Sequence, residues 1–336
     1  MPQRSQPNAK ALVPETSIDL LKKYHESRPL YEKLADEVAF SLEKRLREHK
    51  IPFAHISKRV KTFESISDKL GRKHYDDPWT ELTDISGVRV VFLYASTRSR
   101  IESTVEKEFK VLEKVDKLTG LQDDQFGYGA LHYVVALSDA TSGARYEDLK
   151  NLVCEIQIRT VMQDAWAIID HHLVYKNEAS VPTKFKRRLN TISGMFENID
   201  EQFDRMRIER EAYVKEISEQ TQKVEVFHQQ EINFETVNAY LKETFPSLPF
   251  AASSEHISRV INSISACGFK ILADLELVLR RTKKARQALS GESPAKFAVA
   301  ELARAVALCL PEYRKTGWNA ERIKQFQKFE YLVERS

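Results

Sequence analysis

Cysteine, long apolar runs and a strong net charge are all scarce or missing in this chain of 336 residues. Its three cysteines, Cys154, Cys267 and Cys309, are odd in number, far apart and set among apolar residues, which argues against a disulfide framework and a zinc site. No apolar run approaches the length that spans a bilayer, and the amino terminus lacks the apolar core of a signal peptide. We therefore expect a soluble cytoplasmic protein with no membrane partner.

The charge balance is nearly even, with 52 lysines and arginines against 49 acidic residues and a formal net charge of +3. Any affinity for nucleic acid must then come from local basic patches, because the charge of the whole chain is too small to supply it. The length suits one large domain or two ordinary ones, with ample apolar content for a core. Function must therefore be sought in local patterns.

The most informative stretch is residues 151–176. It opens with a short apolar run rich in β-branched residues and continues with apolar positions at helical spacing, which predicts a strand that leads into a helix. Glu155 and Gln157 stand two residues apart and so share one face of the strand. Burying a carboxylate there is costly unless it pairs with a cation, binds a metal or exchanges a proton, which favours a functional role. A strand with one solvent-exposed face is the competing interpretation, because such strands are common. Both interpretations stay open on this stretch alone.

Residues 59–73 form a basic segment with an apolar stripe at helical spacing, which predicts a helix from about Thr62. The first turn of that helix would present free N–H groups beside Arg59 and Lys61. Such a turn favours an anion site suited to polyphosphate. An ordinary solvated, charged helix is the competing interpretation.

Two further features carry candidate chemistry. Asp84 precedes a buried strand at residues 88–93, a place where magnesium-binding carboxylates commonly sit, although turn and cap aspartates are found there too. Tyr128 lies between Gly127 and Gly129, where the backbone can approach a ligand and the ring can stack on a base. An ordinary glycine-rich turn explains the second feature equally well.

The remaining pattern is largely helical. Residues 18–49 predict one helix, which Pro29 is expected to bend or break. Beyond residue 182 a long helical run precedes several short helices, and the long helix can pack on the preceding domain, bridge to the next segment or form a homo-oligomer. The order of elements before residue 177 indicates a mixed sheet with helices against it.

Four motifs together resemble the synthetase domain of the RelA/SpoT family, in order and approximate spacing. They are RVKTFESISDKLGRK at 59–73, DISGVRV at 84–90, FGYGALH at 126–132 and EIQIRTVMQDAWAIIDHHLVYK at 155–176. The resemblance covers about half the chain. We therefore expect an α+β fold with a nucleotidyltransferase-like mixed sheet flanked by helices, followed by a long helix and a small all-α C-terminal domain.

The expected segments are a flexible arm (1–16), a pyrophosphokinase domain (17–180), a long connecting helix (181–224) and a helical accessory or regulatory domain (225–336). The last of these is either a stabilising appendage or a module that responds to a regulatory partner. We expect the family's hydrolase domain to be missing, because only about 20 residues precede the first helix.

The resemblance implies an enzyme that moves the β,γ-pyrophosphate of ATP to a ribose 3′-hydroxyl, usually that of GDP or GTP. On the donor side, Arg59 and Arg89 resemble the pair that sandwiches the adenine, and a guanidinium plane suits a purine face. Lys61, Ser65 and Lys69 resemble the residues that hold the ATP phosphates.

The resemblance also assigns the metal and the acceptor side. Asp84 resembles a ligand of Mg²⁺, the expected cofactor, and Glu155 resembles the second carboxylate, which assists the metal and activates the attacking hydroxyl. Tyr128 matches the tyrosine that stacks on the acceptor base. His132 and Gln157 match polar residues near the acceptor.

The acceptor segment departs from the family pattern, because Asp123 and Asp124 stand where a basic residue is usual and Ala130 replaces a serine. This variant is similar to toxic small alarmone synthetases, some of which modify the 3′ end of tRNA or make adenosine alarmones. A guanine nucleotide is therefore the first expectation, with the tRNA 3′ end or an adenine nucleotide as the alternative. A non-catalytic nucleotide or RNA sensor is a further alternative, against which the presence of both Asp84 and Glu155 argues.

Overall fold

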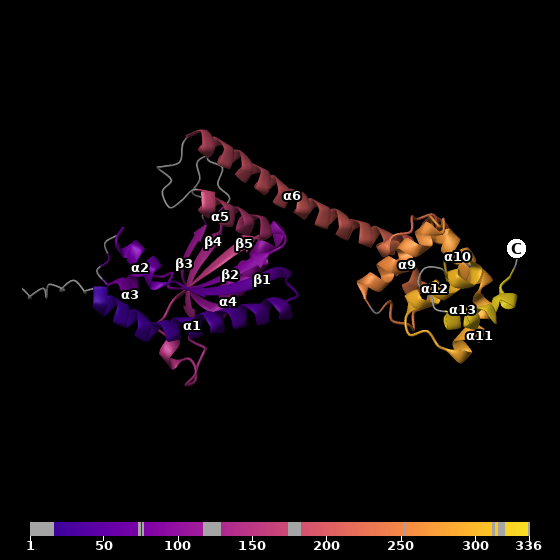
Figure 1. Cartoon of the computed structure of the whole chain (residues 1–336), viewed down its shortest axis with the longest axis horizontal. Coiled ribbons are helices and arrows are strands. Elements are labelled where there is room, and N and C mark those ends of the chain that lie inside the picture. Colours follow the sequence, from indigo (N-terminus) through magenta and orange to yellow (C-terminus); the bar gives the residue numbers. More distant parts are fainter. Residues whose placement is uncertain are drawn as a thin grey trace, which may run out of the picture. The chain divides into compact units, whose positions relative to one another are not determined.

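The computed structural model describes residues 17–72, 75, 77–116, 129–173, 183–251, 253–310, 313–314 and 320–334. The chain divides into two compact units, Met1–Met206 and Arg207–Ser336, with the division inside one long helix, α6 (Thr183–Gln220) (Figure 1). The first unit combines a mixed sheet with helices and the second is helical, which confirms the predicted fold class. The predicted segment boundaries stay predictions. None of the helices described here is long and apolar enough to cross a membrane.

The described part of the first unit contains a five-stranded sheet with the order β1-β2-β5-β4-β3. Its strands are β1 (Phe53–Val60), β2 (Ser86–Phe92), β3 (Phe109–Asp116), β4 (Leu131–Leu137) and β5 (Cys154–Thr160). Strands β2 and β5 run parallel, whereas the other three pairs are antiparallel. The central strand, β5, therefore carries Glu155, and its parallel neighbour β2 follows Asp84.

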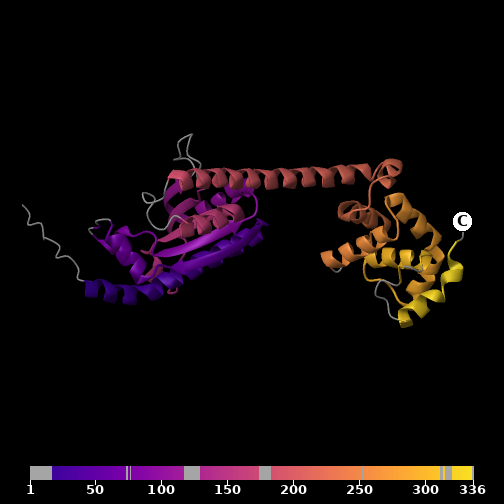
Figure 2. The same cartoon turned by 45° about the horizontal axis from the view of Figure 1, so that its top comes forward.

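One face of the sheet packs on α1 (Ser17–Glu48) and α4 (Arg98–Glu108). Leu34, Val38 and Leu42 recur every four residues along α1, so they line one stripe of the helix, and all three are fully buried in this core. Helix α5 (Val161–Leu173) lies on the opposite face, as both views of the fold show (Figures 1 and 2). The face toward α5 is the one that carries Glu155.

Helix α1 continues through Pro29, which corrects the expectation of a break at that residue. A proline removes one backbone hydrogen bond of the helix. Tyr24 and Tyr31, on either side of it, are only 3% and 4% exposed and share a small core with Ile66. Their packing keeps both halves of the helix against the same partners and offsets the lost bond.

That small core positions two short helices, α2 (Phe63–Leu70) and α3 (Pro78–Glu81), next to the start of β2. Two 3-10 helices, η1 (Ala95–Thr97) and η2 (Glu147–Leu149), complete the described elements of this unit.

The second unit has a hydrophobic core of its own, built around α12 (Ala298–Cys309). Its other helices are α7 (Val224–His228), α8 (Phe234–Thr244), α9 (Ser254–Ala266), α10 (Leu272–Arg281), α11 (Lys283–Glu292), α13 (Ala320–Gln327) and the 3-10 helix η5 (Glu330–Leu332). The buried Glu301 pairs with Arg286 at 2.9 Å and with Arg304 at 3.1 Å, so its charge is compensated inside this core.

Candidate active site

The register of the sheet brings the predicted residues of four strands onto one face. Gly87 pairs with Arg59 on one side and with Glu155 on the other. Two residues along, Arg89 pairs with Gln157, and Gln157 pairs with His132. Directly paired residues share a face of a sheet, and so do residues two apart on one strand. These side chains therefore form one polar surface opposite the apolar core.

Asp84 lies at the edge of this surface, between two lysines. Its Oδ2 accepts hydrogen bonds from Lys61 Nζ at 2.6 Å and from Lys69 Nζ at 2.9 Å. Burial by itself would raise the pKa of Asp84, but the two lysines outweigh it and hold the pKa below the ordinary value. The other oxygen, Oδ1, is buried and has no hydrogen-bond partner in the described structure.

Helix α2 supplies part of a cavity beside Asp84. Its N-cap, Thr62, accepts a hydrogen bond from the backbone N–H of Ser65 at 3.4 Å. The cavity has a volume of about 510 Å³ and is lined by Lys61, Ser65, Asp68, Lys69, Arg72, Asp84 and His171. Lys61, Lys69 and Arg72 thus bring three cationic groups to a space beside a carboxylate, which suits a polyphosphate with a divalent cation.

Glu155 is held at both of its oxygens. His132 Nδ1 lies 2.7 Å from Oε1, and Gln157 Nε2 donates to Oε2 at 2.7 Å. Burial would raise the pKa of Glu155, but His132 and Gln157 lower it more, so it stays below its ordinary value. The charge of Asp84 acts in the opposite direction and raises this pKa, which places the two carboxylates within electrostatic reach of each other.

Arg59 and Arg89, the predicted adenine pair, line one small cavity of about 90 Å³ together with Ser57, Lys58, Gly87, Val88 and Gln157. The side chain of Arg59 lies across Gly87, where an added Cβ would be 3.7 Å from its Cγ. Arg89 donates from NH1 to Asp164 Oδ1 at 2.9 Å, which fixes its guanidinium plane. The structure therefore brings together two guanidinium groups on adjacent strands.

Among the residues at this site that the sequence analysis did not assign are Arg72, Arg159, Asp164 and His171. Arg159 lies two residues beyond Gln157, so the alternation of a strand could have placed it on the same face. Burial and the nearby Arg89 lower its pKa to about 10, while Asp164, 3.7 Å away, partly offsets this. Sequence carries no signal for the pairing with Asp164, because that contact depends on how α5 turns over the sheet.

Of the ten predicted site residues, the structure describes nine, and Tyr128 lies outside the described residues. Lys61, Ser65, Lys69 and Asp84 line the larger cavity. His132, Glu155 and Gln157 form a second group around the Glu155 carboxylate.

A magnesium ion fits the donor groups present. The buried Asp84 Oδ1 has no hydrogen-bond partner in the described structure, and each oxygen of Glu155 keeps a lone pair beyond its one hydrogen bond. The described residues contain no group of three or more His, Cys, Asp or Glu side chains that could hold a metal ion. Mg²⁺ commonly uses one or two carboxylates and takes its other ligands from phosphates and water. Asp84 and Glu155 would be the two carboxylates that this chain offers to such an ion.

Comparison with known proteins shows which family this chain resembles. Residues 58–180 match the family model described as a region found in RelA / SpoT proteins. GTP pyrophosphokinase YjbM of Bacillus subtilis is 30% identical over 159 residues, which cover 46% of this chain and 72% of that protein. The chain belongs to the RelA/SpoT family. GTP pyrophosphokinase YwaC of the same organism is 28% identical over 157 residues, or 45% of this chain and 71% of that protein.

Solved structures of similar proteins also match this chain. A GTP pyrophosphokinase family protein from Streptococcus pneumoniae is 26% identical, with a TM-score of 0.49, and the match covers 57% of this chain and 96% of that one. Small alarmone synthetase 1 from Bacillus subtilis is 26% identical, with a TM-score of 0.47 and coverage of 57% and 99%. The family assignment confirms the resemblance read from the four motifs and the prediction of a pyrophosphokinase.

Proposed function

We propose that this chain transfers the β,γ-pyrophosphate of ATP to the ribose 3′-hydroxyl of GDP or GTP, with Mg²⁺ as cofactor. The observation that carries the proposal is the cavity beside Asp84, which Lys61, Lys69 and Arg72 line with three cationic groups. The relatives named GTP pyrophosphokinases support the guanine nucleotide as acceptor.

In this proposal, ATP lies with its adenine between Arg59 and Arg89 and its phosphates along Lys61, Ser65 and Lys69. Both arginines line the small cavity on β1 and β2, and the phosphate residues line the larger cavity. A guanidinium plane stacks on a purine, and ammonium groups neutralise the phosphate charge. The phosphate oxygens would replace Asp84 as the acceptors of the two lysine hydrogen bonds.

Transfer joins the acceptor 3′-oxygen to the β-phosphorus while the bond from that phosphorus to the α,β-bridging oxygen breaks, so AMP leaves. The hydroxyl proton passes to Glu155, which is ionised at neutral pH because its pKa lies below the ordinary value. Asp84 and Glu155 would hold Mg²⁺, which when bound would neutralise charge on the transferred group. His132 and Gln157 hold the Glu155 carboxylate in one orientation.

The tRNA 3′ end is the second candidate acceptor, and adenine nucleotides are an equal alternative to it. It is favoured by Asp123 and Asp124, because negative charge in the acceptor segment gives a diphosphate acceptor less electrostatic help. A base at the tRNA end still offers Tyr128 a stacking partner.

The test is transfer of label from γ-labelled ATP with Mg²⁺ to GDP, GTP, ADP, ATP and deacylated tRNA, each offered separately. Label on GDP or GTP is the expected result. Label on tRNA alone makes the chain a tRNA-modifying enzyme, and label on ADP or ATP alone makes it an adenosine alarmone synthetase. Binding of ATP and Mg²⁺ without transfer to any acceptor contradicts the enzymatic proposal and favours a sensor.

A further inference from the structure

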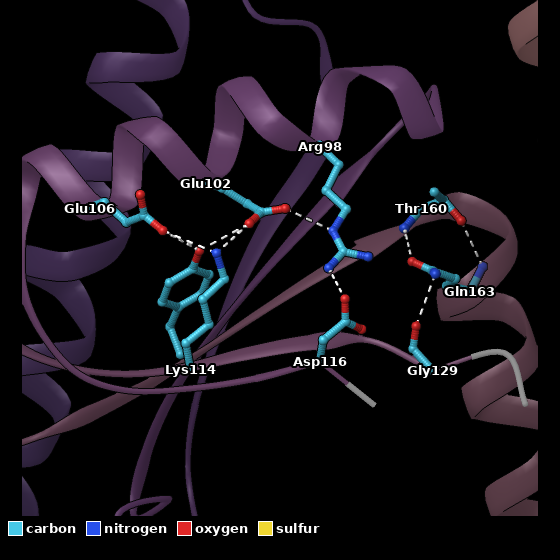
Figure 3. A network of polar contacts seen from close by, with 9 residues as sticks. Arg98, Glu102, Glu106, Lys114, Asp116, Gly129, Thr160 and Gln163 are labelled. Atoms are coloured by element: carbon cyan, nitrogen blue, oxygen red, sulfur yellow. Dashed lines mark hydrogen bonds and ion pairs between the residues drawn. The ribbon is translucent and has the colours of Figure 1, made fainter. Parts of the chain in front are cut away.

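Asp116 and Gly129, the described residues that flank residues 117–128, each accept a hydrogen bond from the side chain of a helix residue. At the end of β3, the Asp116 carboxylate accepts a hydrogen bond from the Arg98 guanidinium (Figure 3). At the start of the next described stretch, the Gly129 carbonyl accepts one from Gln163 Nε2 at 2.9 Å (Figure 3). Arg98 and Gln163 come from different helices, α4 and α5.

The side chain of Gln163 is itself fixed by Thr160. Gln163 Oε1 accepts from the Thr160 backbone N–H at 2.9 Å, and the Gln163 backbone N–H donates to Thr160 Oγ1 at 3.0 Å (Figure 3). Thr160 Oγ1 donates in turn to Asp200 Oδ2 on α6 at 2.6 Å. Thr160, Gln163 and Asp200 are all buried, so water does not replace these bonds readily.

A second aspartate of α6, Asp204, bonds to the turn just before Arg98, the residue that donates to Asp116. Asp204 Oδ2 accepts from the Ser96 backbone N–H at 2.8 Å, and Asp204 Oδ1 accepts from Ser96 Oγ at 2.6 Å. Ser96 lies in η1, and Arg98 begins the helix that follows directly. Asp200 and Asp204 are four residues apart, so they lie on one face of α6.

We propose that Asp200 and Asp204 are positioning residues through which α6 sets the affinity for the acceptor. The inference rests on the proposed function, in which His132 on β4 is an acceptor-side residue; Gly129 lies just before that strand, and Asp116 pairs with Leu131 in it. A shift of Gly129 or Asp116 should therefore weaken acceptor binding more than ATP binding. The ATP phosphates lie instead along β1 and α2, whose described hydrogen bonds involve neither aspartate.

The test compares matched variants of the full chain. Thr160→Val removes the hydroxyl between Gln163 and Asp200 with little change in shape, whereas Thr160→Ser keeps it. Asp204→Ala removes the acceptor of both Ser96 hydrogen bonds at a partly exposed position, which leaves the core intact. Glu201→Gln is the control, because this exposed acid pairs along α6 with Arg205 at 3.5 Å.

We expect Thr160→Val and Asp204→Ala to raise the KM for the acceptor about five- to tenfold, the effect of one to two lost hydrogen bonds. The Kd for a non-hydrolysable ATP analogue should stay within about twofold of the wild-type value. Thr160→Ser and Glu201→Gln should match the wild type in both. Equal rises in the Kd for the ATP analogue and in the KM for the acceptor overturn the inference. An unchanged acceptor KM in stable variants also overturns it.

A second measurement does not depend on turnover. Amide hydrogen exchange should become faster at residues 110–116 in Asp204→Ala and at residues 129–135 in Thr160→Val, with no change at residues 61–70. If the wild-type chain labels no acceptor, the proposed function and the inference about acceptor affinity both fail, whereas the exchange experiment still shows whether the two aspartates hold these backbone segments. Unchanged exchange at both ends rejects the positioning role whatever the reaction is.

Discussion

Replacing Asp84 with asparagine should raise the affinity for metal-free ATP and lower the turnover with Mg²⁺. The carboxylate accepts hydrogen bonds from both Lys61 and Lys69 through one oxygen, while its other oxygen has no hydrogen-bond partner in the described structure. In the proposed reaction, ATP phosphates take the two lysines and Mg²⁺ takes the carboxylate. Asp84→Asn removes the group that competes with phosphate for the lysines, and it also removes a metal ligand.

The expected size of the first effect follows from the hydrogen bonds. A hydrogen bond to a charged group contributes about 1.5–3 kcal/mol. The side chains of Lys61 and Lys69 are 16% and 33% exposed, so solvent screening makes the lower end appropriate. About 1.4 kcal/mol corresponds to a factor of ten in affinity. ATP without metal should therefore bind Asp84→Asn up to about tenfold more tightly than the wild type.

Turnover should fall by about a thousandfold or more in the same variant, because the charge that holds the metal is gone. ATP affinity is measured by calorimetry in the presence of a chelator, and turnover by label transfer with Mg²⁺. Asp68→Asn is the matched control, because this aspartate lines the same cavity at a more exposed position, 3.8 Å from Arg72. It should change both quantities by less than about threefold.

The two results together test the assignment of Asp84. Weaker binding of metal-free ATP by Asp84→Asn would show that phosphate does not compete with Asp84 for the lysines. Near-normal turnover in the folded variant would remove Asp84 from the metal site. Equal effects of Asp68→Asn and Asp84→Asn would mean that the cavity responds only to its total charge.

Three other predictions concern the rest of the site and the core. Arg89→Lys should weaken ATP binding about tenfold, because an ammonium cannot stack on adenine as a guanidinium does. An unchanged Kd for ATP in calorimetry would contradict the stacking of Arg89 on adenine. Glu155 has a lowered pKa, so it stabilises the fold above its ordinary pKa of 4.5 and this stabilisation is lost on acidification below that value. Urea unfolding of Glu155→Gln should accordingly depend less on pH below about 4.5 than that of the wild type, and identical pH profiles would contradict the shift. Leu42→Ala should lower the unfolding free energy of the first unit by about 3 kcal/mol, since Leu42 is fully buried, and a loss below about 1 kcal/mol would mean that α1 packs loosely there.

Much of the catalytic half could be predicted because its signals are local. The alternation along residues 155–157 placed Glu155 and Gln157 on one face, and the register of β2 and β5 agrees. Helix α2 was expected from an apolar stripe, and its buried Ile66 belongs to that stripe. Such periodicities need only a few neighbouring residues.

The contacts that sequence could not supply join distant segments. Arg89 and Asp164 are 75 residues apart, and Ser96 and Asp204 are 108 apart. No short pattern encodes such a pair, because each depends on the relative placement of a strand or turn and a helix. The continuation of α1 through Pro29 was missed for the same reason, since the compensation comes from packing against α2.

The pairing of β2 with β5 also determines when activity can appear during synthesis of the chain. Ser86 and Cys154, which face each other at the start of this parallel pair, are 68 residues apart. Closing so long a loop delays pairing, and Asp84 and Glu155 come together only afterwards. A nascent chain that has not yet emerged from the ribosome to about residue 160 lacks Glu155 or the strand that carries it. The two carboxylates of the proposed metal site are thus brought together only after most of the first unit has been made.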